Sequence, residues 1–173
     1  NTAKLSVGIL SAYQLYGDGS KLTGISAGGF TPDADENLVA GTSAGEDLDG
    51  TNACCNILIG YHAGKEMTSG SDNIVLGRSA MGAGTVTGTH NIAMGNKAGN
   101  CIASGSYNIF FGRYAGSTNY GTRNVAIGCM AGMHASGGQN DNVFVGTYAG
   151  CCAKSYRNIA LGYQALKKST SGG

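Results

Sequence analysis

The residue types in this chain that could carry out chemistry are cysteine, histidine and the carboxylates, and their spacing decides whether they do. The cysteines include two adjacent pairs but no CxxC spacing, so neither a zinc ribbon nor a redox pair is indicated. Two interpretations stay open: free thiols in a reducing compartment, or disulfides between successive segments or between chains. Adjacent cysteines seldom reach the geometry needed to bond to each other. The six are Cys54, Cys55, Cys101, Cys129, Cys151 and Cys152.

Six of the ten carboxylates lie in one window, at Asp33, Asp35, Glu36, Glu46, Asp47 and Asp49. Residues 47–52 are weakly similar to a calcium loop, but they lack the alternating ligands and the distal glutamate of an EF-hand, so a solvated loop is favoured. A glycosidase would need two carboxylates held across a cleft, and a Gly-flanked window offers no such frame.

The remaining polar residues give no stronger signal. The three histidines lie at different repeat offsets, and no Ser, His and Asp form a recognisable nucleophile elbow. We therefore predict no catalytic, cofactor-binding or metal site, and no enzymatic activity.

The elements that position these residues belong to a tandem repeat. Each copy reads Asn, three mostly apolar residues, Gly, two variable residues, Ala and usually Gly, as in NILIGYHAG and NVFVGTYAG. Eight copies follow one another at spacings of 16 to 19 residues. They begin at Asn37, Asn56, Asn73, Asn91, Asn108, Asn124, Asn142 and Asn158.

Each repeat position has a structural interpretation. The first and third residues after the Asn share one face of a strand, so we expect pairs such as Ile57 and Ile59 to form the buried stripe. The residue between them varies from Ala93 to Phe110, and we expect this second face to make contacts as well. The recurring Ala fits a tight inner corner. Stacked asparagines predict a hydrogen-bonded ladder with a structural role.

A glycine after each strand is expected to end it, because glycine tolerates positive φ and close backbone approach. These glycines include Gly60, Gly77, Gly95, Gly112, Gly128, Gly146 and Gly162. Two glycines per repeat and apolar runs of three residues exclude helices of useful length. The predicted fold class is all-β, a repetitive β-solenoid or β-roll of eight rungs, about 38 Å long.

The predicted core of one chain is thin. Each rung offers two or three large apolar side chains, whereas ordering each residue costs about 1–2 kcal/mol. We therefore predict that chains pool their apolar stripes in an intertwined or side-by-side homotrimer. Residues 37–173 form the solenoid, and residues 1–36 a strand and loop that lead into it. The C-terminal residues resemble an inter-repeat linker, as expected of a fragment of a longer fibre.

The two variable positions after the strand glycine are the best candidates for an exposed contact surface. Stacked along a rod, their rings and multidentate donors could bind sugars, although a solvated rim that tolerates any polar residue is the simpler interpretation. The contact candidates are Tyr61, Arg78, Lys97, Arg113, Tyr114, Tyr148 and Tyr163.

Charge and hydropathy exclude two classes of partner. The net charge is +1, with no Lys/Arg block of the kind that nucleic-acid binding requires. The apolar runs of four or five residues are far too short to span a membrane.

Two protein families share these motifs. The units NIALGYQAL and NVAIG…AG resemble the NTAIGYQAL-type repeats of phage tail-fibre and related virion proteins, notably of marine and cyanobacterial phages. YGDGSKLTGI, residues 16–25, resembles the GDGSxLTGI element that often precedes such regions, so the resemblance covers residues 16–173. The heads of YadA-like trimeric autotransporter adhesins carry a similar NxxAIG strand in shorter rungs, and the longer spacing here favours the phage family.

Both resemblances imply trimers and attachment. The expected function is therefore a structural or adhesive rod, the shaft or receptor-contacting segment of a viral tail fibre. It would present a repetitive surface to a host-cell glycan or protein, at the virion surface or outside the cell. The alternatives are a self-assembling extracellular filament protein and a bacterial trimeric adhesin head.

Overall fold

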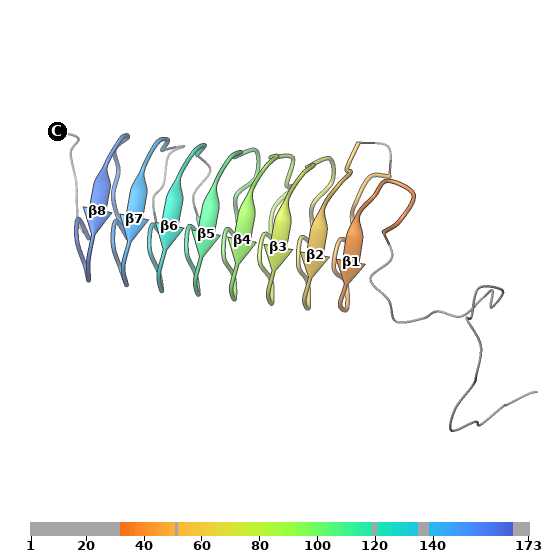
Figure 1. Cartoon of the computed structure of the whole chain (residues 1–173), viewed down its shortest axis with the longest axis horizontal. Coiled ribbons are helices and arrows are strands. Elements are labelled where there is room, and N and C mark those ends of the chain that lie inside the picture. Colours follow the sequence, from red (N-terminus) through yellow and green to blue (C-terminus); the bar gives the residue numbers. More distant parts are fainter. Residues whose placement is uncertain (1–31, 51, 119–120, 135–138, 168–173) are drawn as a thin grey trace, which may run out of the picture.

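The structure, a computed structural model, describes residues 32–50, 52–118, 121–134 and 139–167, which coil into a row of eight short strands (Figure 1). Each strand pairs in parallel with the next one along the chain, and equivalent repeat positions lie opposite each other, as Ile57 does with Ile74. The predicted all-β solenoid is confirmed. The strands are β1 (Leu38–Ala40), β2 (Ile57–Ile59), β3 (Ile74–Leu76), β4 (Ile92–Met94), β5 (Ile109–Phe111), β6 (Val125–Ile127), β7 (Val143–Val145) and β8 (Ile159–Leu161).

A glycine follows every strand because the backbone there takes a positive φ, which residues with a Cβ rarely adopt. The φ angles of these glycines lie between 112° and 135°. Space is short as well, since a Cβ on Gly60 would lie 2.8 Å from the carbonyl oxygen of Gly77. Two residues later the chain takes left-handed φ even at large side chains, such as Lys97 at 56° and Tyr114 at 58°. Every strand therefore runs into the same tight corner.

The asparagines form the predicted ladder. From Asn56 onward, the backbone N–H and the side-chain Nδ2 of each Asn donate to Oδ1 of the Asn one rung earlier, at 2.9–3.1 Å. Nδ2 also donates to a backbone carbonyl of the return segment, as Asn56 does to Gly70 at 2.8 Å. Seven of the eight asparagines are buried. Their amides thus satisfy one another inside the coil, where an unpaired polar group would be costly.

The interior is lined by the central residues of β2 to β8, whereas Val39, the central residue of β1, is exposed. Leu58, Val75 and Phe110 are fully buried, together with Met67 and Ile102 from the return segments. Seven of the eight recurring alanines are buried and Ala165, in the last described rung, is partly buried; the seven are Ala44, Ala63, Ala80, Ala98, Ala115, Ala131 and Ala149.

The first and third residues of the strands, which we expected to form the buried stripe, lie instead on the outer face. In β2, Ile57 and Ile59 are partly exposed on either side of the buried Leu58. This expectation is wrong because the chain returns behind the central residue, through the recurring Ala, so the narrow interior holds only one side chain from each strand.

Large and small central residues alternate along the second half of the rod. The sequence from β4 to β8 is Ala93, Phe110, Ala126, Phe144 and Ala160, and all five are buried. Because neighbouring strands lie about 4.8 Å apart, each phenylalanine ring uses the space that its alanine neighbours leave open. The size variation that the sequence shows at this position is therefore a packing pattern.

Within the described residues, the first ladder Asn is Asn37 and the coil continues through Lys167. Most of the predicted lead-in, including the GDGSKLTGI element, and residues 168–173 lie outside the described residues. None of the described segments forms a helix long and apolar enough to cross a membrane.

Candidate functional site

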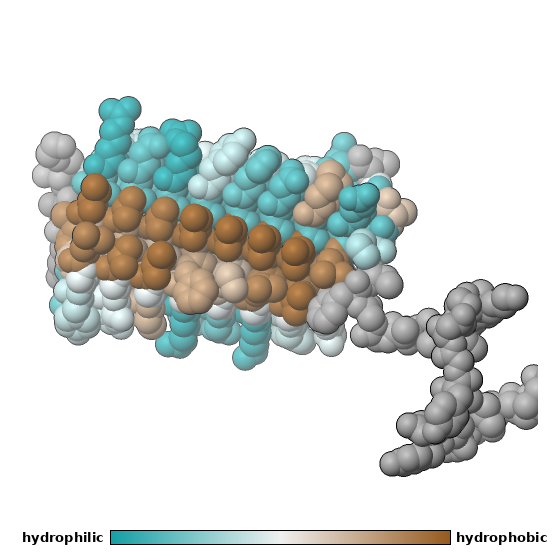
Figure 2. All heavy atoms as spheres, viewed as in Figure 1, coloured by the Kyte–Doolittle hydropathy of each residue, from teal (hydrophilic) through white to brown (hydrophobic). Residues whose placement is uncertain are grey.

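The outward side chains of the strands form two apolar columns that run the length of the rod. Figure 2 shows them as one continuous hydrophobic band between two polar margins. Exposure is substantial for residues of this type, reaching 51% at Phe111 and 73% at Ile159. We call this surface the outer apolar face; it comprises Leu38, Ala40, Ile57, Ile59, Ile74, Leu76, Ile92, Met94, Ile109, Phe111, Val125, Ile127, Val143, Val145, Ile159 and Leu161.

The size of this face can be estimated from sheet geometry. Seven spacings of about 4.8 Å make it about 34 Å long, and side chains make it about 10 Å wide, so it covers on the order of 350 Å². The face is therefore within the range of the largest apolar patch on a typical soluble monomer, about 300–600 Å², a patch that is often functional.

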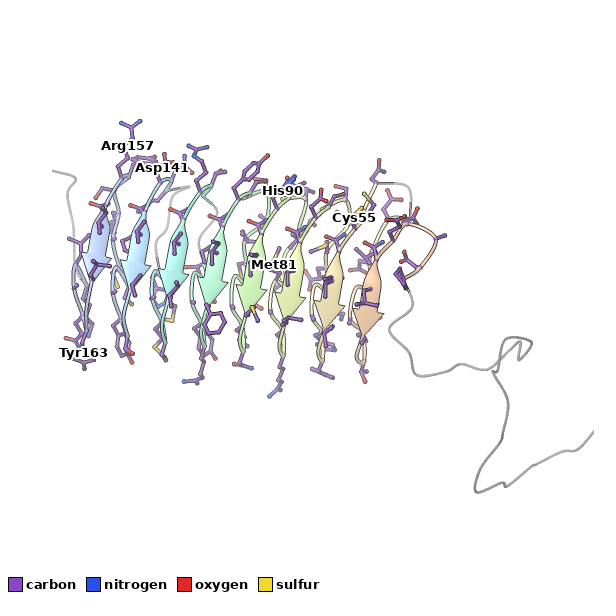
Figure 3. The ribbon with its side chains drawn as sticks, in the orientation of Figure 1. Cys55, Met81, His90, Asp141, Arg157 and Tyr163 are labelled. Carbon is purple, nitrogen blue, oxygen red and sulfur yellow. The ribbon has the colours of Figure 1, made fainter. Side chains whose placement is uncertain are left out.

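The corner after each strand carries the predicted contact candidates. We call the two residues that follow the strand glycine the corner edge; it runs along the end of the strands where Tyr163 lies in Figure 3. Tyr61 and Tyr163 are 48% and 72% exposed. The corner therefore gathers all seven contact candidates along one edge of the rod: Tyr61, Arg78, Lys97, Arg113, Tyr114, Tyr148 and Tyr163.

Cations on the corner edge lie against its rings. The Arg113 guanidinium carbon is 4.8 Å from the centre of the Tyr114 ring, and Lys97 Nζ is 5.6 Å from the same point. Arg78 lies 5.8 Å from the centre of the Tyr61 ring. Such cation–π contacts hold long side chains in place without neutralising their charge.

The residues that precede each ladder Asn form the opposite edge of the rod, where Cys55, His90, Asp141 and Arg157 lie in Figure 3. Here charges are paired between rungs. The Arg123 Nε and an Asp141 carboxylate oxygen are 2.6 Å apart, and His90 lies 3.8 Å from Asp72. The hydrogen bond from Arg123 lowers the pKa of Asp141 below its ordinary value.

Charge is distributed unevenly along the axis. Residues 32–72 carry eight carboxylates and one Lys, whereas residues 73–167 carry seven Lys or Arg and one carboxylate, Asp141. The net charge of the chain is therefore small although residues 32–72 are acidic and residues 73–167 are basic.

Asp33, which sequence reasoning treated as one of an acidic cluster, begins the Asn ladder. Its Oδ1 accepts hydrogen bonds from the backbone N–H of Asn37 at 2.8 Å and from Asn37 Nδ2 at 3.3 Å. Burial tends to raise the pKa of Asp33, but the hydrogen bonds from Asn37 and from the Asp35 backbone outweigh it and lower this pKa. The signal that could have revealed this role is an acceptor side chain just before the first ladder Asn.

The remaining acidic residues of the described segments do not converge on a site. Asn52 Nδ2 donates to Asp49 at 2.7 Å within the loop that resembled a calcium loop. Among the described residues, no three His, Cys, Asp or Glu side chains group as metal ligands would. His62 lies on the corner edge against Tyr61, and His90 on the opposite edge against Tyr107.

The six cysteines are free thiols in the structure. Cys151 and Cys152 have their sulfur atoms 3.7 Å apart. A hydrogen bond with Cys54 raises the pKa of Cys55 to about 11, and burial raises that of Cys151 to about 11. At neutral pH these two are protonated and therefore weak nucleophiles.

Comparison with known proteins identified no relative of this chain. A scan against protein-family models gave no match, and searches of curated proteins and of solved structures found nothing significantly similar.

Proposed function

We propose that this chain is a structural rod that associates with two copies of itself through the outer apolar face. It serves as the shaft or receptor-contacting segment of a viral tail fibre, at the virion surface, and carries out no catalytic step. A parallel β-solenoid is compatible with a structural or fibrous role.

The observation that carries the proposal is the uninterrupted apolar character of the outward strand positions. A solvent-facing sheet usually alternates apolar and polar residues. Here all sixteen outward positions of the eight strands are Ile, Leu, Val, Met, Phe or Ala. Burying them between chains adds the core that a single coil lacks, where many interior residues are alanine.

Three chains fit this face better than two. The face consists of two parallel columns, the first and the third residues of the strands. Around a three-fold axis each chain meets two neighbours, so each column can pack against a different one. A cyclic arrangement also closes the assembly and leaves no apolar column uncovered.

The tail-fibre assignment rests on the sequence resemblance of the repeats and of the GDGSKLTGI element. The rod adds a physical reason, because register-matched rungs give a stiff element that can hold a surface away from the body of a particle. The alternatives differ in assembly, since a filament grows without a fixed mass.

The test is the mass of the assembly measured by light scattering, in reducing and in non-reducing buffer. The wild-type chain is expected at three chain masses in both. Ile74→Glu with Ile109→Glu, both on the outer apolar face, is expected to give a folded monomer, because two buried carboxylates per chain would oppose association. Thr87→Glu with Ser104→Glu adds the same charge at exposed polar positions of the return segments, and should leave the mass unchanged.

Two results would contradict the proposal: a wild-type monomer, or an outer-face variant that keeps the wild-type mass. Open-ended assemblies would support the filament. Dissociation on reduction would place cysteines at the joints between chains.

A further inference from the structure

We propose that the corner edge of rungs two to eight binds an acidic polysaccharide, a linear chain of sugars that carries carboxylate or sulfate groups. This inference rests on the proposed attachment role and names the chemistry of the partner.

The first reason is that the cations of this edge have no carboxylate partner in the described part of the chain. Arg78, Lys97 and Arg113 lie on three successive rungs, and the three described ion pairs involve other residues. Their described contacts are with the rings of Tyr61 and Tyr114. A cation that is oriented by a ring and unneutralised can still form a charge-assisted hydrogen bond with an incoming anion.

The second reason is the contrast with the opposite edge. There Arg123 makes two hydrogen bonds to the carboxylate of Asp141, so that pair has little charge to offer a ligand. From residue 73 onward the corner edge contains no carboxylate at all. The corner edge therefore carries cations on three successive rungs with no carboxylate among them, whereas the opposite edge carries Arg123 paired with Asp141 and a single exposed Arg157.

The third reason is spacing. In-register rungs lie about 4.8 Å apart, so Arg78 and Arg113, at the first corner position of rungs three and five, are about two rung spacings apart, with Lys97 at the second corner position of the rung between them. An extended polysaccharide advances by one sugar ring per residue, a comparable step, so consecutive acidic groups can meet consecutive cations. The exposed rings of Tyr61 and Tyr163 can stack on the apolar C–H faces of the sugars. Several weak contacts along one line then add up in avidity.

A nucleic acid is a poorer fit to the same edge. Nucleic-acid-binding surfaces carry clustered Lys and Arg side chains. Here the corner Arg and Lys residues lie one to a rung on rungs three to five, and the corners of rungs six to eight carry none.

The experiment measures binding of the full chain to alginate oligosaccharides of defined length at low salt, by isothermal titration calorimetry. Dextran oligosaccharides serve as the uncharged probe and oligo(dT) as the nucleic-acid probe. The test variant is Arg78→Gln with Lys97→Gln and Arg113→Gln. The matched control, Arg123→Gln with Lys154→Gln and Arg157→Gln, removes the same charge outside the corner edge.

We expect the wild-type chain to bind alginate in preference to dextran and oligo(dT), with an affinity that falls as salt is added. The corner variant should bind alginate at least about tenfold more weakly, because each exposed ion pair contributes modestly and three are lost. The matched control should stay within about twofold of the wild type, since its cations lie outside the proposed site.

Three results would overturn the inference: no binding of alginate by the wild type, equal losses in the two variants, or tighter binding of oligo(dT). Tyr114→Leu provides a second variant that changes no charge, and it too should weaken binding of alginate. Light scattering on the same samples keeps the two proposals separable, because a monomer that binds alginate would refute the trimer alone, and a trimer that does not bind would refute the polysaccharide alone.

Discussion

Removing one asparagine from the middle of the ladder should destabilise the rod more than removing one from its last described rung. Asn108 takes part in four side-chain hydrogen bonds: Nδ2 donates to Asn91 Oδ1 and to the Gly121 carbonyl, and Oδ1 accepts from the backbone and side chain of Asn124. Asn158 takes part in two, from Nδ2 to Asn142 Oδ1 and to the Ser155 carbonyl.

The magnitudes follow from this difference. At about 1 kcal/mol for each hydrogen bond, Asn108→Ala should lower the free energy of unfolding by about 4 kcal/mol and Asn158→Ala by about 2 kcal/mol. The loss at Asn108 is larger because its Asn partners are buried, and the backbone N–H of Asn124 would be left without its acceptor.

The assay is urea denaturation followed by circular dichroism, at one protein concentration, because association also contributes to stability. Hydrogen exchange at the amides of β5 and β6 shows whether the loss stays local, as a nearest-neighbour array allows. Equal losses in the two variants, or a loss of less than about 1 kcal/mol at Asn108, would refute the ladder as a source of stability.

Two further predictions concern the two faces of β5 and the start of the Asn ladder. Phe110→Ala should lower the free energy of unfolding by about 3–5 kcal/mol, because it opens a cavity in the interior. Phe111→Ala, on the outer apolar face, should mainly reduce the mass of the assembly measured by light scattering. The reverse pattern would contradict the assignment of faces. For Asp33, whose folded-state pKa is lowered, the stabilisation is present above its ordinary pKa of about 3.9 and is lost as the pH falls through the folded-state value. Asp33→Asn supplies an uncharged acceptor at the same place, so the drop in urea midpoint between pH 6 and pH 3 should be smaller in this variant than in the wild type, and an equal drop would count against the role of Asp33.

The features that could be predicted from the sequence are those that the local backbone conformation requires. The glycine after each strand is needed for its positive φ, and the Ala at the corner for its small size, and both requirements recur in every rung. The Asn ladder was predictable for the same reason, because parallel stacking at one repeat per rung superimposes equivalent residues.

The direction of the strand faces was not predictable from apolarity alone. Ile57, Leu58 and Ile59 are all apolar, so alternation identifies which residues share a face without identifying the core. The available signal lay in the central position, where Phe110 is flanked by Ala93 and Ala126. Outward side chains do not share an enclosed space within one chain, so large residues there need no small neighbours on the adjacent strands.

Contacts between rungs also escaped prediction. The Asp72–His90 and Arg123–Asp141 pairs join residues 18 apart, and only the register of the coil brings them together. The contact candidates lie on one edge because each is the first or second residue after a strand glycine, but their cation–π contacts depend on side-chain directions that the sequence does not specify.

The alternation of phenylalanine and alanine in the interior has a consequence for how such a rod changes length. Deleting the single repeat of residues 124–141 would preserve the register of the ladder but would place Phe110 directly beside Phe144, and two rings cannot share that narrow space. Deleting residues 124–157 would instead bring Phe110 beside Ala160. In this half of the molecule, adding or removing two repeats together preserves the alternation of large and small central residues, whereas a single-repeat change interrupts it.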